Sequence, residues 1–337
     1  MKQYLLGMRP TEIEEAVRDS GLPKYTTAQI VQWVYRKRVK SIDEMTNISL
    51  KNRKILSERF EVGRSEPENI ETSSDGTQKM LFRTSNGNYI ETVTIPEEDR
   101  LTICISSQIG CKMNCAFCMT GKMGFHGNLS VTEILNQVYS VPRSQAITNL
   151  VFMGMGEPLD NYENVRKASE LLMADYGPAW SPKRITLSSI GLKKNLKRFL
   201  DESHCHLAIS LHNPFASQRL TMMPVEKASP IVEIIELLRQ YDWSHQRRLS
   251  FEYIMFKGVN DTPVYARETG KLLTGLNCRV NLIRFHAIPG SDLAPSDPGT
   301  MEHFRNFLSA KGVICTIRAS RGEDISAACG MLSTLKH

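Results

Sequence analysis

Apolar residues between positions 26 and 60 recur every three or four residues, which places them on one face of a helix. Thr11-Glu-Ile-Glu14 has the pattern of a capping box, and Ser49 stands before another amphipathic stretch. The sequence therefore predicts a small helical domain over residues 1–64.

The hydrophobic period changes to two from about Glu66. Residues 79–83 and 89–95 flank Asn86-Gly87, the dipeptide that two-residue hairpin turns favour. We expect a short β-hairpin extension over residues 65–100.

From residue 101 onward, short apolar runs alternate with amphipathic stretches. Repeated strand–helix units form parallel sheets with right-handed crossovers, so this pattern predicts an α/β domain over residues 101–337. Periodicity does not distinguish a closed barrel from a partial one. The expected strands are residues 101–105, 148–153, 184–188, 206–211, 249–255, 279–283 and 313–318.

Unusual polar clusters follow most of these strands. They lie at residues 106–118, 154–158, 188–191, 210–212 and 284–289. The carboxyl ends of parallel strands share one edge of a sheet, where the loops are free to bind ligands. We expect a single composite site at that edge.

The composition describes a folded cytoplasmic protein. Of the 337 residues, 41% are hydrophobic and 23% charged, which excludes a disordered chain. No apolar run approaches the roughly 18 residues of a membrane span, and no signal peptide is visible, so no membrane association is expected. Residues 1–64 carry 13 Lys and Arg against 8 Asp and Glu, most of the net charge of +6. A polyanionic partner such as nucleic acid and a solvated helical face both explain this excess.

Four of the eight cysteines lie within residues 104–118. Stable disulfides are rare in the cytoplasm, so this density indicates metal or redox chemistry. Cys111, Cys115 and Cys118 give three thiolates on one loop, enough for three corners of an iron–sulfur cluster or for a zinc site completed by Cys104 or His126. The cysteines expected to be buried core thiols are Cys205, Cys278 and Cys315.

The Cys-x-x-x-Cys-x-x-Cys spacing at 111–118 matches the motif of the radical S-adenosylmethionine (SAM) superfamily. Residues 104–111, 152–158, 210–212 and 322–330 together resemble the RlmN/Cfr family of methyltransferases, which modify an adenosine in 23S ribosomal RNA. The resemblance spans essentially the whole chain, including the helical N-terminal domain.

The resemblance implies a partial (β/α) barrel of the radical SAM type, a [4Fe-4S] cluster on Cys111, Cys115 and Cys118, and two molecules of SAM per turnover. It places Glu157 near the SAM amino group, which a carboxylate suits as an acceptor. His286 stands where family members often have Asn, and His can also donate a hydrogen bond. The residues implied to contact SAM are Gly156, Glu157, Pro158, Ser188, Ser210, Leu211, His212 and His286.

The resemblance also implies a cysteine relay. Cys329 matches the residue that becomes S-methylcysteine and carries the methyl group to the base, and Cys104 matches the thiol that resolves the adduct by forming a disulfide. Glu91 matches the proposed proton acceptor, whose pKa we expect to be raised if it is buried.

The family uses its N-terminal domain to hold structured RNA. The implied partners are 23S rRNA, tRNA, a cytosolic electron donor and a disulfide reductant, and a monomer is expected. The candidate phosphate contacts are Arg36, Lys37, Arg38 and Lys40.

Two alternatives compete with methylation of adenine C2. The sister activity methylates C8, and Pro158 argues against it because the C8 enzymes read Gly-Glu-Ala where this chain reads Gly-Glu-Pro. A non-catalytic, zinc-containing RNA-binding protein is the alternative from another class, and it leaves Cys329 unexplained.

Overall fold

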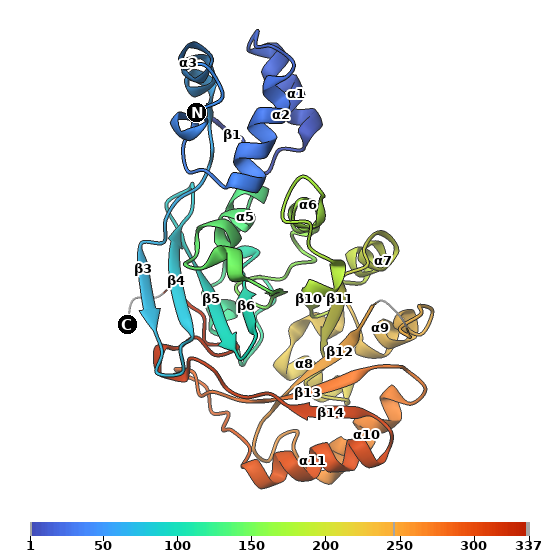
Figure 1. The fold of residues 1–337 in the computed structure, drawn as a ribbon. Coiled ribbons are helices and arrows are strands. Elements are labelled where there is room, and N and C mark those ends of the chain that lie inside the picture. The colour runs from blue at the N-terminus through green and yellow to red at the C-terminus, as the bar shows by residue number, and fades with distance from the viewer. Residues whose placement is uncertain (1, 245–246, 335–337) are drawn as a thin grey trace.

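The computed structural model describes residues 2–244 and 247–334, and its centre is a ten-stranded sheet (Figure 1). The strands run in the order β14-β13-β12-β11-β10-β9-β6-β5-β4-β3. The seven strands from β14 to β6 are mutually parallel. They are β6 (Arg100–Cys104), β9 (Asn149–Phe152), β10 (Ile185–Ser189), β11 (His206–Ser210), β12 (Leu249–Met255), β13 (Arg279–Arg284) and β14 (Ile314–Ile317).

The expected α/β architecture is confirmed, because each predicted strand overlaps an observed one. In the described part of the chain, β14 and β3 are the two edges of the sheet and do not pair with each other, so the barrel is partial. All seven residues of β12 are buried, as in a central strand covered on both faces. The helices of this part are α5 (Val131–Ser140), α6 (Tyr162–Met173), α7 (Lys193–Glu202), α8 (Ala216–Met222), α9 (Ile231–Leu238), α10 (Pro263–Leu273) and α11 (Pro298–Ala310).

The predicted hairpin is present and is continuous with the main sheet. The strands β4 (Gln78–Arg83) and β5 (Tyr89–Glu97) pair antiparallel across the Asn86-Gly87 turn, where Gly87 has a φ of 82°. Because β5 also pairs with β6, and β3 (Asn69–Thr72) pairs with β4, residues 69–97 extend the sheet by three antiparallel strands.

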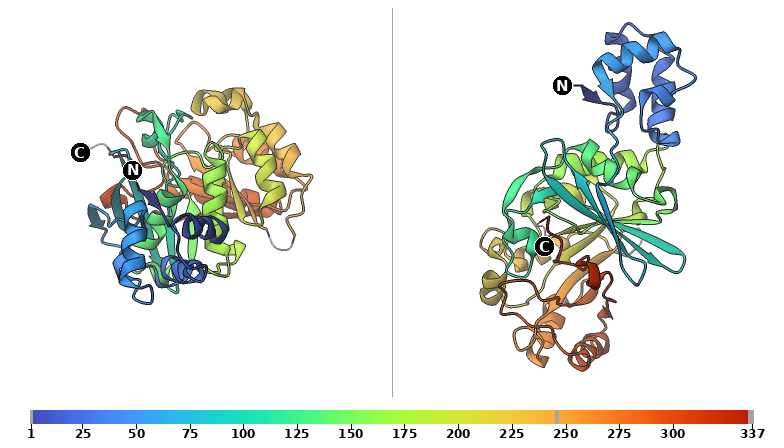
Figure 2. Two further views of the ribbon diagram at one scale, coloured as in Figure 1. Left: turned by 90° about the horizontal axis from the view of Figure 1, so that it is seen from above. Right: turned by 90° about the vertical axis from the view of Figure 1, so that its left-hand side faces the viewer.

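The N-terminal residues form a helical module at one end of the molecule (Figures 1 and 2). Its first helix begins at Pro10, so the predicted capping box at Thr11–Glu14 is not the start of the helix. The N-cap residue is Arg9 instead, and its backbone amide donates to Glu12 Oε2 at 2.5 Å. Its elements are β1 (Gln3–Tyr4), α1 (Pro10–Asp19), α2 (Thr26–Val31), a π-helix (Gln32–Lys37), α3 (Leu50–Arg59) and β2 (Phe60–Glu61).

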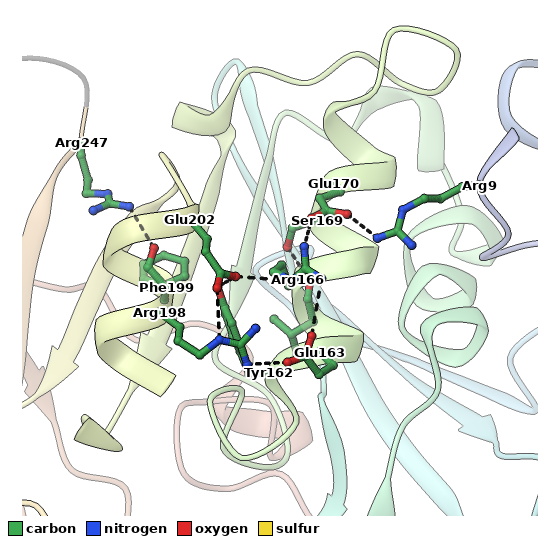
Figure 3. A network of polar contacts seen from close by, with 11 residues as sticks. Arg9, Tyr162, Glu163, Arg166, Ser169, Glu170, Arg198, Phe199, Glu202 and Arg247 are labelled. Carbon is green, nitrogen blue, oxygen red and sulfur yellow. Dashed lines mark hydrogen bonds and ion pairs between the residues drawn. The ribbon is translucent and has the colours of Figure 1, made fainter. Parts of the chain in front are cut away.

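Ion pairs join this module to helix α6. Arg9 lies 2.7 Å from Glu170, which also pairs with Arg166 (Figure 3), and Lys167 lies 2.8 Å from Glu12. These contacts fix the basic module against the outer layer of the barrel. None of the helices within the described residues has the length and apolar character of a membrane span.

Candidate active site

A cavity opens where the parallel strands end, and the three cysteines of the motif line it. They lie on the loop between β7 (Gln108–Gly110) and the short helix α4 (Met119–Lys122), and the Ala116 amide donates to the Met222 carbonyl at 2.9 Å. The lining residues include Cys111, Cys115, Cys118, Gly156, Glu157, Ser188, Ser210, His212, Glu252 and Cys329.

The chemistry of these thiols fits an iron–sulfur cluster. Burial raises the pKa of Cys111 to about 12, and it raises the pKa of Cys115 and of Cys118 as well. The three would repel one another as thiolates unless a cationic group bound between them, and a cluster with cysteine ligands is such a group. Among the described residues, no three His, Cys, Asp or Glu side chains are arranged to hold a single metal ion.

The residues proposed to complete a zinc site are engaged elsewhere. The charged neighbours of the Cys104 thiol are Cys329 and Arg318 rather than the three motif cysteines. His126 is exposed, and its Nε2 lies 3.0 Å from the Met123 carbonyl oxygen.

The Gly-rich turn after β9 packs tightly against residues 105–108, which follow β6. Gly156 has a φ of +93°, and a Cβ added there would lie 2.4 Å from Cβ of Gln108. A side chain at Gly156 would therefore both strain the backbone and clash. The neighbouring Pro158 is buried but does not line the cavity.

Glu157 lines the cavity with a carboxylate that already accepts three hydrogen bonds. Its Oε1 accepts from Ser189 Oγ at 2.6 Å and from the Leu159 amide at 3.0 Å, and its Oε2 accepts from the Ile190 amide at 3.0 Å. Burial raises its pKa to about 7, against the effect of these bonds. The carboxylate is thus fixed in place, with lone pairs left for a ligand.

His212 is held as a neutral ring beside the cysteine loop. Its Nδ1 accepts from the Ile254 amide at 3.0 Å, so the proton of the neutral ring is on Nε2. Burial lowers its pKa to about 3, and its ring lies edge-on to Phe117 with centroids 4.8 Å apart. The neighbouring Leu211 is buried and is not part of the cavity wall.

The structure places His286 against the C-terminal segment (residues 319–334) rather than at the cavity. Its ring nitrogens lie 3.1 Å from Ser320 Oγ and 3.2 Å from Glu323 Oε1. The ring is buried and is not part of the cavity wall. His286 therefore fastens the segment that carries Cys329.

Further hydrogen bonds hold that segment across the mouth of the barrel. Lys79 Nζ donates to the Ile325 carbonyl at 2.6 Å, and the Met119 amide donates to the Gly330 carbonyl at 2.9 Å. Cys329 lies between these anchors, exposed and on the cavity wall. Other such pairs are Asp75 with Gly322, Ser73 with Asp324, and Thr120 with Leu332.

Cys104 and Cys329 share a cationic neighbour that the sequence did not reveal. Burial raises the pKa of the Cys104 thiol to about 12, and the guanidinium of Arg318 opposes this shift there and at Cys329. Arg318 NH1 lies 3.6 Å from Glu252 Oε2 and 3.6 Å from Met153 Sδ. Glu252 and Met153 thus hold Arg318, whose positive charge favours the thiolate form of both cysteines.

Glu91 lies in β5 with its carboxylate turned to the same segment. Its Oε2 accepts from the Ser333 amide at 2.8 Å, and Oε1 lies 3.4 Å from Lys79 Nζ. Burial raises the pKa of Glu91 to about 7, against the effect of both partners. A carboxyl with such a pKa can take up a proton near neutral pH.

A buried ion pair supports the strand end at Ser210. Arg219 is fully buried and pairs with Glu226. Its Nε donates to the Leu211 carbonyl at 3.0 Å, and NH2 donates to the Ser210 carbonyl at 2.8 Å. No sequence motif marked this pair, which positions the loop that carries His212.

The two arginines of the predicted RNA contact face the protein. The guanidinium of Arg36 donates to the Asp175 carbonyl. Arg38 is half-buried, lies 4.7 Å above the ring of Tyr139, and has a pKa lowered by burial. Both side chains contact the barrel at the base of the module.

Lys37 and Lys40 are exposed, as is Arg36. Lys37 Nζ lies 3.5 Å from the ring centroid of Trp33, and Lys40 forms an exposed ion pair with Glu66. Exposed contacts of this kind are weak and can exchange for phosphate contacts.

The comparisons with known proteins agree with this geometry. Residues 105–266 match the radical SAM superfamily, and residues 3–62 match the ribosomal RNA large subunit methyltransferase N-terminal domain. The chain is 62% identical over 335 residues to the probable dual-specificity RNA methyltransferase RlmN of Phocaeicola vulgatus, covering 99% of this chain and 96% of that protein. It is 41% identical to the dual-specificity RNA methyltransferase RlmN of Marinobacter nauticus, covering 98% and 92%.

A solved structure shares the whole fold. The crystal structure of a radical SAM methyltransferase from Sphaerobacter thermophilus superposes with a TM-score of 0.94 at 38% identity, covering 98% of this chain and 99% of that one. These matches support neither the zinc protein nor the C8 enzyme. The resemblance in the sequence is confirmed, and the chain belongs to the RlmN family of radical SAM enzymes.

Proposed function

We propose that the protein methylates C2 of an adenine in 23S rRNA and of the adenosine beside the anticodon in tRNA, through S-methylcysteine at Cys329. The observation that carries the proposal is the position of Cys329 on the wall of the cavity that the three motif cysteines line. The dual specificity in the names of the relatives supports two RNA substrates.

Two cofactors follow from this proposal. Cys111, Cys115 and Cys118 hold a [4Fe-4S] cluster, and the polar side chains of Glu157, Ser188 and Ser210 with His212 bind SAM. When bound, these cofactors supply the methyl group for Cys329 from one SAM and a radical from a second SAM.

The protein's own residues then complete the transfer. The S-methyl group of Cys329 would give up a hydrogen atom to the radical, and its carbon would then bond to C2 of the base, which joins protein and RNA through a thioether. The unpaired electron of this adduct would return to the cluster. Glu91 accepts the proton that leaves C2. The Cys104 thiolate attacks the Cys329 sulfur and the C–S bond breaks. The released carbon takes up a proton to become the methyl group of the base, and a disulfide remains. A cytosolic reductant reopens this disulfide, and a separate donor supplies electrons to the cluster.

The N-terminal module supplies phosphate contacts in this proposal. Arg36, Lys37 and Lys40 are the exposed cations of the predicted set, and Arg38 is half-buried against the barrel. Such contacts position an RNA without reading its sequence. The protein acts as a monomer in the cytoplasm.

Two variants test the relay. In Cys104→Ala the thioether adduct forms and is not resolved, so a denaturing gel of a reaction with SAM, reductant and an rRNA fragment shows RNA-shifted protein. Cys329→Ala gives neither adduct nor methylated RNA, while its cluster absorbance is unchanged. The buried core thiol of Cys315 offers a control, because Cys315→Ala keeps activity without a shifted band. Methylation by Cys329→Ala would refute the relay.

A further inference from the structure

A second cavity, of about 380 Å³, lies at the opposite edge of the sheet from the candidate active site. His206, Leu249, Arg279 and Ile314 line it, and each is the first residue of its strand. The active-site residue Ser210 is the last residue of β11, which begins at His206. The two cavities are therefore at opposite ends of the same strands.

Basic residues dominate this second cavity. The described residues of its wall include four cations, Lys183, Arg247, Arg248 and Arg279, together with His206, and no Asp or Glu. Its remaining lining residues are Trp243, Ser244, Leu249, Asn277, Cys278 and Ile314. We call this the amino-edge cavity.

One of the four cations has a structural role. Arg247 donates to the carbonyls of Leu200 and Phe199 at 3.0 and 3.2 Å and so caps the end of α7 (Figure 3). Within the described residues, no ion pair or side-chain hydrogen bond is formed by the other three, and Lys183, Arg248 and Arg279 are exposed.

The cations of the cavity repel one another. Burial lowers the pKa of His206 to about 4, and Arg248, Lys183, Arg247 and Arg279 lower it further in that order. The His206 ring is neutral, since Nδ1 accepts from the Arg248 amide at 2.9 Å. Like charges gathered without a counter-charge destabilise a fold, so the cluster indicates a bound anion.

Another cavity with four cations on its wall differs from the amino-edge cavity. A cavity of about 690 Å³ between the helical module and β4 has both signs of charge on its wall. Its cations are Lys2, Lys40, Arg64 and Arg83, and its carboxylates are Asp43, Glu61, Glu66, Glu68 and Glu133. Lys2 and Lys40 there form ion pairs with Glu61 and Glu66, whereas Lys183, Arg248 and Arg279 form no ion pair with a described residue.

We infer that the amino-edge cavity is a phosphate-binding site, in which Lys183, Arg248 and Arg279 hold one or more phosphate groups. Two guanidinium groups offer paired N–H donors to phosphate oxygens, and the ammonium adds a point charge. The phosphates come either from the backbone of a bound RNA or from a small polyphosphate. The site does not depend on the proposed methylation, because it lies at the other end of the barrel.

The test compares the full-length protein with a triple variant, Lys183→Gln, Arg248→Gln and Arg279→Gln. The control removes the same charge from three exposed cations outside the cavity, as Lys194→Gln, Lys227→Gln and Arg267→Gln. Two probes are titrated: sodium pyrophosphate, by calorimetry and by the rise in unfolding temperature that a ligand of the folded state causes, and a structured rRNA fragment at several salt concentrations.

Either source of phosphate gives a distinct result. If the RNA backbone occupies the site, the triple variant binds the fragment at least tenfold more weakly, and the slope of log affinity against log salt falls by about 2, as expected for three lost phosphate contacts. If a small polyphosphate occupies it, pyrophosphate binding is lost in the triple variant and RNA binding is unchanged. The inference is overturned if the triple variant and the control bind both probes equally.

The unfolding temperature of the triple variant shows whether it is folded. Removing three mutually repelling charges should leave the unfolding temperature of the triple variant in phosphate-free buffer equal to or above that of the wild type. A lower unfolding temperature would show that the cluster stabilises the fold by itself, and would also overturn the inference.

Discussion

The backbone amide of Ser333 donates a hydrogen bond of 2.8 Å to Glu91 Oε2, which ties the segment carrying Cys329 to strand β5. Glu91, the proposed proton acceptor, thus hydrogen-bonds to a residue four positions after Cys329, the proposed methyl carrier. Any shift of this segment moves both groups together.

Glu91 gives the protein a specific dependence on pH. Its pKa in the fold is about 7, above the ordinary value of 4.5, so the folded state binds more protons than the unfolded state between these values. Its contribution to stability is complete below pH 4.5 and is lost as the pH rises through 7. The free energy of unfolding should therefore fall less between pH 4.5 and 7 in Glu91→Gln than in the wild type. Urea unfolding at a series of pH values measures this difference.

Glu71→Gln is the matched control, because Glu71 also pairs with Lys79 but is half-exposed. It should leave the pH dependence near that of the wild type. An unchanged pH profile in Glu91→Gln would mean that Glu91 titrates normally in the fold.

Arg318 should control how fast Cys104 and Cys329 form a disulfide. Its charge lowers the pKa of both thiols, so Arg318→Gln should leave less thiolate at neutral pH and slow disulfide formation about tenfold. The rate is measured in cluster-free protein treated with diamide, as a function of pH. In Arg318→Gln, the rate of disulfide formation should begin to rise at a higher pH than in the wild type.

Arg318→Lys keeps the charge and should restore most of the rate. The control Arg305→Gln removes a half-buried arginine whose side-chain hydrogen bonds within the described residues go to Asn306, and it should change nothing. Equal rates in Arg318→Gln and the wild type would exclude an electrostatic role for Arg318.

His286→Ala should loosen the C-terminal segment rather than weaken SAM binding. The ring contacts Ser320 and Glu323, so its removal should raise the rate at which iodoacetamide alkylates Cys329 several-fold. The affinity for SAM, measured by equilibrium dialysis with cluster-loaded protein, should change less than threefold. A large loss of SAM affinity with unchanged alkylation would instead make His286 a SAM ligand.

Charge reversal at Lys37 and Lys40 should weaken RNA binding and flatten its salt dependence. Two lost phosphate contacts lower the slope of log affinity against log salt by about 1 to 2. Reversal at Lys194 and Lys227, two exposed lysines of the barrel, provides the control. An unchanged slope would show that Lys37 and Lys40 do not contact RNA phosphates.

Local patterns predicted the strands and the site at their carboxyl ends. The apolar run at residues 249–255 is the fully buried strand β12, and Asn86-Gly87 forms the predicted turn between β4 and β5. Such signals are visible because each depends on residues close together in the chain.

Contacts between distant residues could not be predicted in this way. Arg318 and Glu252 meet only because β14 and β12 flank β13, and nothing in either local sequence marks the pair. His286 stands at a position read as a SAM contact, and the fold turns it to the C-terminal segment because Ser320 and Glu323 pack there. The tertiary fold, rather than the motif, decides which surface such a side chain contacts.

The most direct test of the proposed function is nucleoside mass spectrometry of an rRNA fragment after anaerobic incubation with cluster-loaded protein, reductant and SAM. Standards of 2-methyladenosine and 8-methyladenosine separate the two products. We predict 2-methyladenosine, formed by the wild type and absent with Cys329→Ala. Formation of 8-methyladenosine, or of no methylated adenosine by protein with an intact cluster, would contradict the proposal.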